Sequence, residues 1–456
     1  MAVVENARVA TFRWQRDALL VAVGALMLTW PAALNRFPLI FHDTNSYVQF
    51  LVETYRSIFY KLFVAASGLH WTIWGTPIAQ ALIASALILI FLRLFGFGRT
   101  LPFLAVMVCL AAISSLPMFA MFVMPDVFTG LMFLTLFMLI FLFDRMTLIL
   151  RLLLFALLFL FIASHLSHLV LALAIIAACT VGLWLWAPEA PRVGIALAFG
   201  ASTAVAAALM LYNGMENRSY SASPAGSVFL MANLIEYGPV RRELAEYCPQ
   251  SGYRLCAYQD RLPPTANNFL WGKTSPFETE LGGFDGMREE AAALVRDTLR
   301  HQAGAVRSVT LNNGARALFT LDPTAEIIRM EASVDLLRRV FRNQFGWDTV
   351  HHFEASLQER NRFPRAPVAA LNYAGLILAL VTVAVLAGGR FRPRDWRIWV
   401  FPAFVFVAYI GNAMLCAAAS GVFDRYQARM SWLIPLAALL LILEWLAGRR
   451  LAAGVH

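Results

Sequence analysis

Side chains that could act as bases or bind anions lie where polar loops meet apolar segments. A carboxylate at such a boundary can take a proton from a substrate hydroxyl, and a guanidinium can hold a phosphate through two parallel hydrogen bonds. Ionisable groups at membrane depth are functional candidates because burying them in lipid is costly. The candidates are Asp43, Arg56 and Tyr60 after the first apolar segment, Asp126 after the third, His165 and His168 after the fifth, and Asp424, Arg425, Tyr426 and Arg429 after the ninth.

Each candidate also has a simpler interpretation. Asp43 and Asp126 stand where helices would begin and could cap them, and the two histidines could bond backbone carbonyl groups. The cations could pair with Glu53 or Asp424. Capping alone does not readily explain why separate turns bring ionisable groups to one level, so we expect a functional site there.

The composition shows which kind of protein positions these groups. The chain has 456 residues, of which 60% are hydrophobic and only 14% charged, with a mean hydropathy of +0.64. A soluble domain would carry charge on about a quarter of its residues, so we predict an all-α integral membrane protein. The net charge of +9 comes almost entirely from arginines scattered between apolar segments. Membrane topology explains that pattern better than nucleic-acid binding does.

A membrane crossing needs about 20 apolar residues, and on that basis we expect about ten transmembrane helices. They lie near residues 18–34, 72–94, 101–119, 126–143, 147–163, 168–187, 193–213, 367–388, 398–418 and 430–447. Residues 147–187 could instead form one kinked segment, because Ser164–His168 interrupts the apolar tract. The first span lacks a convincing cleavage site and is expected to remain as a helix.

Arginine placement orients these spans. With the N-terminus in the cytoplasm, the inner turns carry arginines and the outer turns at 121–125 and 164–168 carry none, as the positive-inside rule requires. We therefore expect a multi-pass protein of the bacterial inner membrane with both termini cytoplasmic and the large loop periplasmic. Five cations fall on the outer side against this rule, which indicates anion binding or ion pairing: Arg36, Arg56, Lys61, Arg425 and Arg429.

The predicted domains follow from one long polar region. Residues 1–213 form an N-terminal membrane domain with about seven spans and a juxtamembrane helix near 43–62, and residues 367–456 supply about three more. Residues 214–366 are too long for a loop without structure. We expect them to form a small, mainly helical extracytoplasmic cap, with helices at 291–302 and 325–345.

Two of the five cysteines, Cys248 and Cys256, lie in the cap within CPQSGYRLC. Such spacing closes a short loop, and an oxidising compartment would join the pair in a disulfide. A zinc site is the alternative, but no other Cys or His pair with ligand spacing lies nearby.

The outer polar segments resemble a known family. HDTNSY followed by RSIFYKLF, before a span containing Gln80, resembles the first outer loop of GT-C-type polytopic membrane glycosyltransferases. There, an Asp and a Ser-Tyr pair lead through a juxtamembrane helix to an Arg-x-x-x-Tyr element. MPDVFTGLMFL resembles the family's second acidic turn, and DRYQARMSWLIPL its late Arg-Tyr segment. The resemblance covers roughly residues 15–213 and 367–447; residues 214–366 more nearly resemble uncharacterised bacterial membrane proteins.

Members of that family transfer a sugar from a polyprenyl-phosphate donor to an acceptor on the non-cytoplasmic side. The resemblance implies that Asp43 is the catalytic base, that Arg56, Arg425 and Arg429 hold the donor phosphate, and that Asp126 orients the acceptor or a metal. The expected partners are therefore a polyprenyl-phosphate-linked sugar and a lipid or polysaccharide acceptor. Each outer turn has one acid where the family has pairs, so the number of acids does not support a divalent metal, and no other cofactor is predicted.

Two other functions are consistent with the sequence. A transporter or flippase for a lipid-linked sugar would place polar residues at mid-membrane depth and often contain an internal repeat. We find no repeat, and the polar residues lie at the ends of spans. A non-catalytic assembly protein could use the arginines and aromatic residues of the cap to bind a partner.

Overall fold

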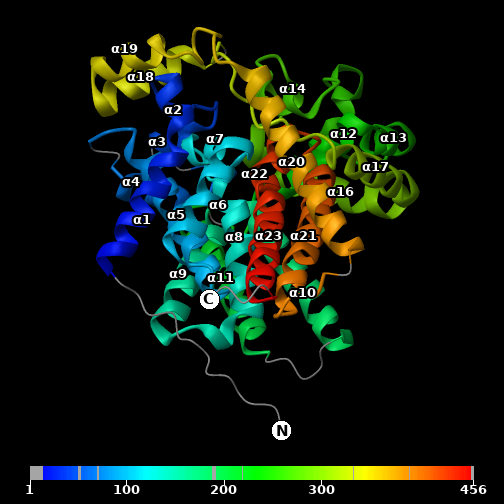
Figure 1. The fold of residues 1–456 in the computed structure, drawn as a ribbon. Helices are drawn as coiled ribbons and strands as arrows, with labels where there is room; N and C mark the ends of the chain where they lie inside the picture. Colours follow the sequence, from blue (N-terminus) through cyan, green and yellow to red (C-terminus); the bar gives the residue numbers. More distant parts are fainter. Residues whose placement is uncertain are drawn as a thin grey trace.

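The computed structural model describes residues 14–49, 53–68, 71–186, 192–217, 219–331, 333–389 and 391–452. Within these ranges all regular secondary structure is helical, apart from an isolated β-bridge between Leu39 and Phe122. The all-α prediction is therefore confirmed for the described chain (Figure 1).

The helices are as follows. The N-terminal part contains α1 (Trp14–Leu28), α2 (Trp30–Asn35), α3 (Thr44–Val48), α4 (Ile58–Ala66), α5 (Gly75–Leu94), α6 (Thr100–Ile113), α7 (Leu116–Met121), α8 (Val127–Phe141), η1 (Phe143–Arg145), α9 (Leu148–Ala163), α10 (Leu166–Trp186) and α11 (Val193–Asn217). The polar region contains α12 (Gly226–Tyr237), α13 (Pro239–Tyr247), η2 (Arg254–Arg261), α14 (Ala266–Trp271), α15 (Pro276–Thr279), α16 (Gly283–His301), α17 (Ala303–Ala317), α18 (Val334–Phe345) and α19 (Trp347–Ala355). The last part contains α20 (Arg365–Gly388), α21 (Arg397–Ala419), α22 (Asp424–Ser431) and α23 (Leu433–Ala452).

Within the described ranges, six helical segments are long and apolar enough to cross a membrane, as a multi-pass membrane protein requires. They are α5, α10, α11, α20, α21 and the segment Asp424–Arg449. Three further predicted spans coincide with shorter apolar helices, α6, α8 and α9. The tract at 147–187 forms two helices, α9 and α10, separated at Ser164 and His165.

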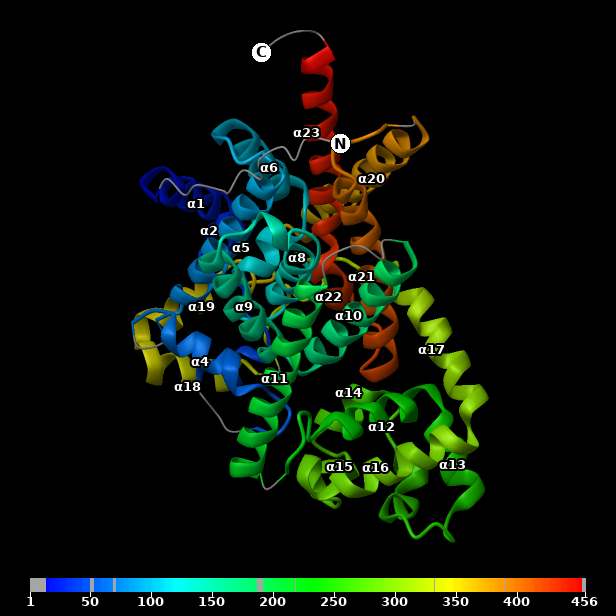
Figure 2. The same cartoon turned by 90° about the horizontal axis from the view of Figure 1, so that it is seen from below.

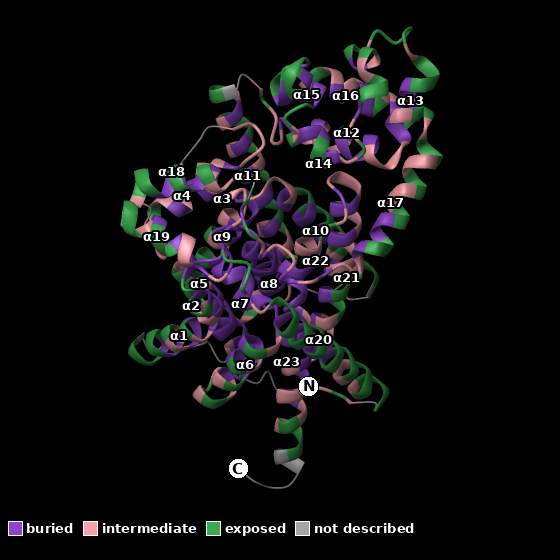
Figure 3. Ribbon diagram, turned by 90° about the horizontal axis from the view of Figure 1, so that it is seen from above, coloured by how far each residue is buried: buried purple, intermediate pink, exposed green. Residues whose placement is uncertain are grey.

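Helix α8 lies at the centre of the bundle, and its residues from Val127 to Ile140 are all buried (Figure 3). A helix that is apolar on every side is expected in such an interior position. Gly130 allows the start of α23 to approach closely, because a Cβ atom there would lie 2.4 Å from Trp432 Nε1. This contact brings the N-terminal end of α8, with Asp126, beside α22.

The polar region divides into two parts, which Figure 2 shows on different sides of the molecule. The α12–α16 unit encloses its own hydrophobic core, which includes Met231, Phe269 and Leu294. In the second part, Ile327, Leu337 and Phe353 belong instead to the main core of the membrane helices. The polar region therefore forms two parts: α12–α16 has its own hydrophobic core, and the part with α18 and α19 packs on the main core.

Two predicted helices in the polar loops are shorter than expected. Of the predicted juxtamembrane helix at 43–62, the structure describes α3 and the beginning of α4, and residues 50–52 lie outside the described ranges. Helix α4 begins after Ser57, whose hydroxyl accepts a hydrogen bond from Phe59 N–H. The segment 325–345 is helical only in α18. Before α18, side chains make the hydrogen bonds that backbone groups would otherwise make within a helix. Gln358 donates to the Ile328 carbonyl, and Glu359 accepts from Met330 N–H.

Candidate functional site

The first outer loop and the turn before α8 are joined by backbone hydrogen bonds. Leu39 N–H donates to Met121 carbonyl at 3.0 Å, and Val123 N–H donates to Leu39 carbonyl at 3.1 Å. The Thr44 hydroxyl adds a bond to the Val123 carbonyl. These contacts fix the loop that carries Asp43 against the turn that carries Asp126.

Asp43 lies between two arginines. Its Oδ1 atom is 2.6 Å from Arg56 Nη2, and its Oδ2 atom is 3.8 Å from Arg425 Nη1. The three side chains are 17%, 15% and 17% exposed, respectively, so the cluster is sheltered and still reaches solvent. Asp43 occupies the N-cap position of α3, but its side chain caps no backbone amide. The structure therefore does not support the interpretation of Asp43 as a helix cap.

A second carboxylate extends this cluster towards α4. Glu53 lies 3.8 Å from Arg56 and 3.3 Å from Lys61, and it accepts hydrogen bonds from Ser46 and Tyr55. Burial lowers the pKa of Lys61, and Glu53 opposes that shift. Ion pairing, the simpler explanation for cations on the outer side, is thus present at Arg56 and Lys61.

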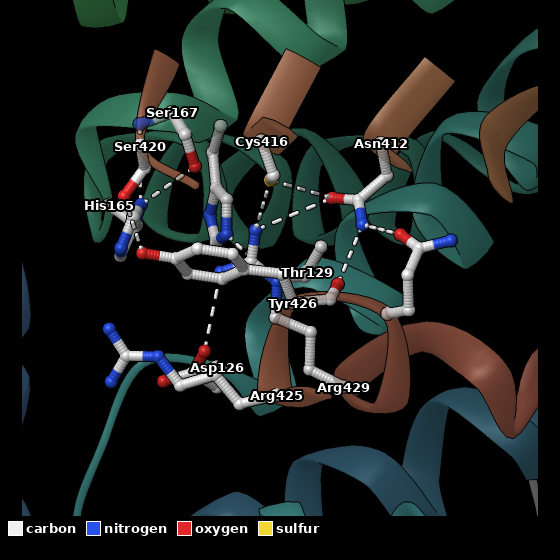
Figure 4. Close-up of polar contacts among 12 residues, drawn as sticks. Asp126, Thr129, His165, Ser167, Asn412, Cys416, Ser420, Arg425, Tyr426 and Arg429 are labelled. Carbon is white, nitrogen blue, oxygen red and sulfur yellow. Dashed lines mark hydrogen bonds and ion pairs between the residues drawn. The ribbon is translucent and has the colours of Figure 1, made fainter. Parts of the chain in front are cut away.

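Arg429 is fully buried next to Asp126 (Figure 4). Its Nη1 atom is 3.3 Å from Asp126 Oδ1, and its Nη2 atom is 3.4 Å from the side-chain oxygen of Asn412 and 3.5 Å from Cys416 Sγ. Asp126 is at the N-cap position of α8, but its side chain caps no backbone amide. Its carboxylate instead pairs with Arg429.

Tyr426 lies between the arginines and the α9–α10 turn. The Arg425 and Arg429 guanidiniums each lie 5.1 Å from the centre of its ring, and its hydroxyl bonds Ser420 at 2.9 Å. Figure 4 shows His165 near this hydroxyl, with its Nδ1 atom bonded to the Ser167 hydroxyl at 2.8 Å. Tyr426 and His165 therefore form one wall of the site.

His168 and Tyr60 have structural partners. Both ring nitrogens of His168 are engaged, by the Thr129 hydroxyl and the Phe161 carbonyl, each at 2.7 Å. The buried Tyr60 hydroxyl donates to Gln80, whose amide donates to the carbonyls of Ala120 and Phe122. His168 therefore joins α10 to α8 and α9, and Tyr60 supports the turn before α8 through Gln80.

The three arginines of the site each have a buried nitrogen without a hydrogen-bond partner among the described residues. These atoms are Arg56 Nε, Arg425 Nη1 and Arg429 Nε. A buried donor without a hydrogen bond costs free energy. Three such donors around two aspartates therefore retain unused capacity to bind an acceptor that is not part of the chain.

Three polar residues that sequence reasoning missed also reach this region. Glu326 lies within electrostatic reach of Arg425, Asp126, Asp424 and Asp43. Buried Gln358 bonds both backbone groups of Ile40 in the first outer loop. Asn412 is a buried polar residue within the apolar helix α21. A polar side chain within a predicted membrane span is a sequence signal that could have identified Asn412 as a candidate.

The described residues do not fit a metal site. Asp43 and Asp126 are paired with arginines, and no group of three or more metal-ligating side chains occurs in the part of the chain that the structure describes. The surface has two further depressions, one in the α12–α16 unit and one near Asp322, whose N–H bonds Asp424. One of about 480 Å³ adjoins Arg254 and Glu290, and one of about 500 Å³ adjoins Asp322, Thr324 and the beginning of α20.

The predicted disulfide between Cys248 and Cys256 is present, with Cα atoms 5.6 Å apart, and both cysteines pack against the core of the α12–α16 unit. Ion pairs join Asp43 to Arg56 and Arg425 and join Asp126 to Arg429. That these residues form one binding site remains a prediction. Comparisons of the chain with models of known protein families, with curated proteins and with solved structures found no match.

Proposed function

We propose that the chain is an integral membrane glycosyltransferase, which moves a sugar from a polyprenyl-phosphate donor to a glycan or lipid acceptor. The observation that carries the proposal is the set of three buried arginine nitrogens, on Arg56, Arg425 and Arg429, that make no hydrogen bond within the described residues around Asp43 and Asp126. Two of them, Arg56 Nε and Arg425 Nη1, lie 3.8 Å from a carboxylate oxygen, which is longer than a hydrogen bond. Phosphate oxygens are the acceptors that guanidinium groups bind most favourably, because paired hydrogen bonds add to charge attraction.

Arg56, Arg425 and Arg429 differ from the other arginines with an unbonded buried nitrogen because they lie together beside the two aspartates. Arg151 and Arg397 also have a buried Nε atom without a partner among the described residues. They lie at the beginnings of α9 and α21, whose opposite ends approach the site. The positive-inside rule already explains arginines at those ends.

The chemistry of the donor fits this arrangement. When the bond between the anomeric carbon and the phosphate oxygen breaks, its electron pair leaves with the polyprenyl phosphate, and fixed guanidiniums stabilise the charge that develops. The acceptor oxygen bonds to the anomeric carbon, and its proton passes to a carboxylate. The sequence predicts Asp43 as this base, but the proposed function does not depend on which carboxylate of the site takes the proton.

The full topology belongs to the proposal. We propose about ten spans, which adds α1 and the shorter apolar helices to the six long segments. Both termini are then cytoplasmic, the cap is periplasmic, and the membrane is the bacterial inner membrane. The arginines Arg93, Arg145 and Arg192 support this orientation, because they lie at the opposite ends of the helices from Asp43 and Arg425.

Binding of undecaprenyl monophosphate tests the donor site directly. The full-length protein in lipid nanodiscs should bind it and should not bind undecaprenol, which lacks the phosphate. Arg425→Gln should weaken binding about 10- to 100-fold, since hydrogen bonds to charged groups contribute about 1.5–3 kcal/mol.

Arg425→Lys should also weaken binding, although it keeps the charge, because it loses the planar fork. Arg339→Gln, at an exposed position of α18, is the matched control and should bind like the wild type. Equal binding of undecaprenol and its phosphate, or unchanged affinity in Arg425→Gln, would refute the proposed donor site.

A further inference from the structure

An irregular segment of the polar region crosses the charged cluster. We call residues 322–331 the strap. At its beginning, Asp322 N–H donates to the Asp424 carboxylate at 2.8 Å. Just beyond its end, the Ser333 hydroxyl lies 2.9 Å from His42 Nδ1. The strap therefore runs from the first turn of α22 to the residue before Asp43.

The middle of the strap is also fixed to the first outer loop. The Gln358 side chain donates to the Ile328 carbonyl at 3.1 Å and to the Ile40 carbonyl at 2.6 Å, so it joins the two segments. Glu326 stands between the Asp322 and Ile328 attachments. The strap backbone is thus held by hydrogen bonds on both sides of Glu326.

The Glu326 carboxylate differs from the other acids of the cluster. Asp43 contacts Arg56 and Arg425, Asp126 contacts Arg429, and Asp424 accepts from the strap backbone. Glu326 is partly buried and has no hydrogen bond or ion pair with any residue in the described ranges. Its oxygen atoms are therefore available to a substrate hydroxyl.

The charged surroundings of Glu326 suit a base. Burial raises the pKa of Glu326; Arg425 lowers it, and the carboxylates of Asp126, Asp424 and Asp43 raise it further, so the balance lies above the usual value. A general base works best when its pKa lies near the working pH.

We propose that Glu326 is the catalytic base of the transfer, and this assignment rests on the proposed function. The Glu326 carboxylate takes the proton of the acceptor hydroxyl while the acceptor oxygen bonds to the anomeric carbon. The bond from that carbon to the phosphate oxygen breaks, its electron pair leaves with the polyprenyl phosphate, and Glu326 later releases the proton to water. Asp43 then acts as a positioning residue for Arg56 and Arg425.

The surface next to the strap provides an approach for the acceptor. The depression of about 500 Å³ is bordered by Asp322 and Thr324 of the strap and by Phe363–Pro367 before and within α20. An acceptor bound there would contact the strap at Asp322 and Thr324, close to Glu326 in the chain.

The test compares Glu326→Gln with Asp43→Asn in the full-length protein in nanodiscs. Three quantities are measured: binding of undecaprenyl monophosphate, the infrared band of a protonated carboxylic acid as a function of pH, and transfer of labelled hexose from undecaprenyl-phosphate hexoses to a bacterial lipid extract. Glu331→Gln, on the exposed end of the strap, is the matched control.

Glu326→Gln should bind undecaprenyl monophosphate like the wild type, lose the carboxylic acid band and transfer roughly 10²–10⁴-fold more slowly without the acid limb of the pH profile. Glu326→Asp keeps a carboxylate and should recover part of the rate, which separates the loss of a base from misfolding. Asp43→Asn should change donor affinity and keep the band.

The base assignment alone fails if Glu326→Gln retains the rate, the band or the acid limb while the wild type binds donor and transfers sugar. If the wild type neither binds the phosphate nor transfers sugar, the proposed function fails and the base assignment fails with it. Loss of donor binding in Glu326→Gln together with Glu326→Asp would also refute the assignment, because it would show a structural role.

Discussion

Arg429 and Asp126 form a buried ion pair although they are 303 residues apart in the chain, with 3.3 Å between Arg429 Nη1 and Asp126 Oδ1. The pair joins α22 to the beginning of α8, so it holds the late arginine segment against the centre of the bundle. Removing one partner leaves an uncompensated buried charge, which typically costs about 3–5 kcal/mol.

Asp126→Asn should therefore lower the free energy of unfolding by about 3 kcal/mol or more, measured by denaturant titration in micelles. The double variant Asp126→Asn, Arg429→Gln should be more stable than the sum of the single effects, because neither charge then remains alone. Asp335→Asn, which alters an 85% exposed acid, should change stability by less than about 1 kcal/mol. Strict additivity in the double variant would contradict an energetically coupled pair.

The variant Tyr60→Phe tests whether Tyr60 only supports the turn before α8 or also contacts the donor. The hydroxyl donates to Gln80, which in turn holds the Ala120 and Phe122 carbonyls. Its loss leaves a buried acceptor unsatisfied and should cost about 1–3 kcal/mol of stability. The affinity for undecaprenyl monophosphate should stay within about twofold of the wild type. A tenfold loss of affinity at unchanged stability would instead mean that Tyr60 contacts the donor.

Removal of the disulfide should affect the α12–α16 unit and leave the charged cluster intact. Cys248 and Cys256 are separated by 8 positions, and closing so short a loop stabilises a folded unit by about 2–3 kcal/mol. The double serine variant should thus be cleaved faster in this unit under limited proteolysis, with undecaprenyl monophosphate affinity unchanged. Cys109→Ser is the control. Free thiols at Cys248 and Cys256 in native protein would contradict the bond.

Topology reporters test the proposed orientation. A phosphatase or fluorescent reporter placed after Arg192 should report the cytoplasm, and one placed within Asn267–Asp285 should report the periplasm, because α11 lies between them and is long enough to cross the membrane. The same compartment at both positions would exclude the proposed arrangement.

The sequence predicted the charged cluster better than its surroundings. Asp43, Arg56 and Arg425 were identifiable because ionisable residues next to apolar spans are costly and therefore informative. The roles of Tyr60 and His168 as structural partners depend on Gln80, Thr129 and Phe161, whose proximity is set by helix packing and not by spacing along the chain.

The conformation of the strap also could not be predicted from the sequence, because it depends on contacts with distant residues. The pattern of apolar residues around Ile327 and Ile328 matches a helix, but Gln358 and Glu359 satisfy the strap backbone through their side chains. Such tertiary hydrogen bonds override local preference. For the same reason, no sequence pattern identified Glu326 as a neighbour of Arg425.

One segment of α21 contacts both the polar region and the charged cluster. On one side, Gly314 of α17 lies so close to Met414 that a Cβ atom would be 2.2 Å from its sulfur, and Asn233 of α12 donates to the Ala417 and Ala418 carbonyls. On the other side, Asn412 holds the Tyr426 carbonyl and Arg429. A displacement of α12 or α17 would therefore be transmitted through α21 to Arg429 in α22, so that movement in the polar region and the geometry of the Arg429–Asp126 ion pair are mechanically coupled.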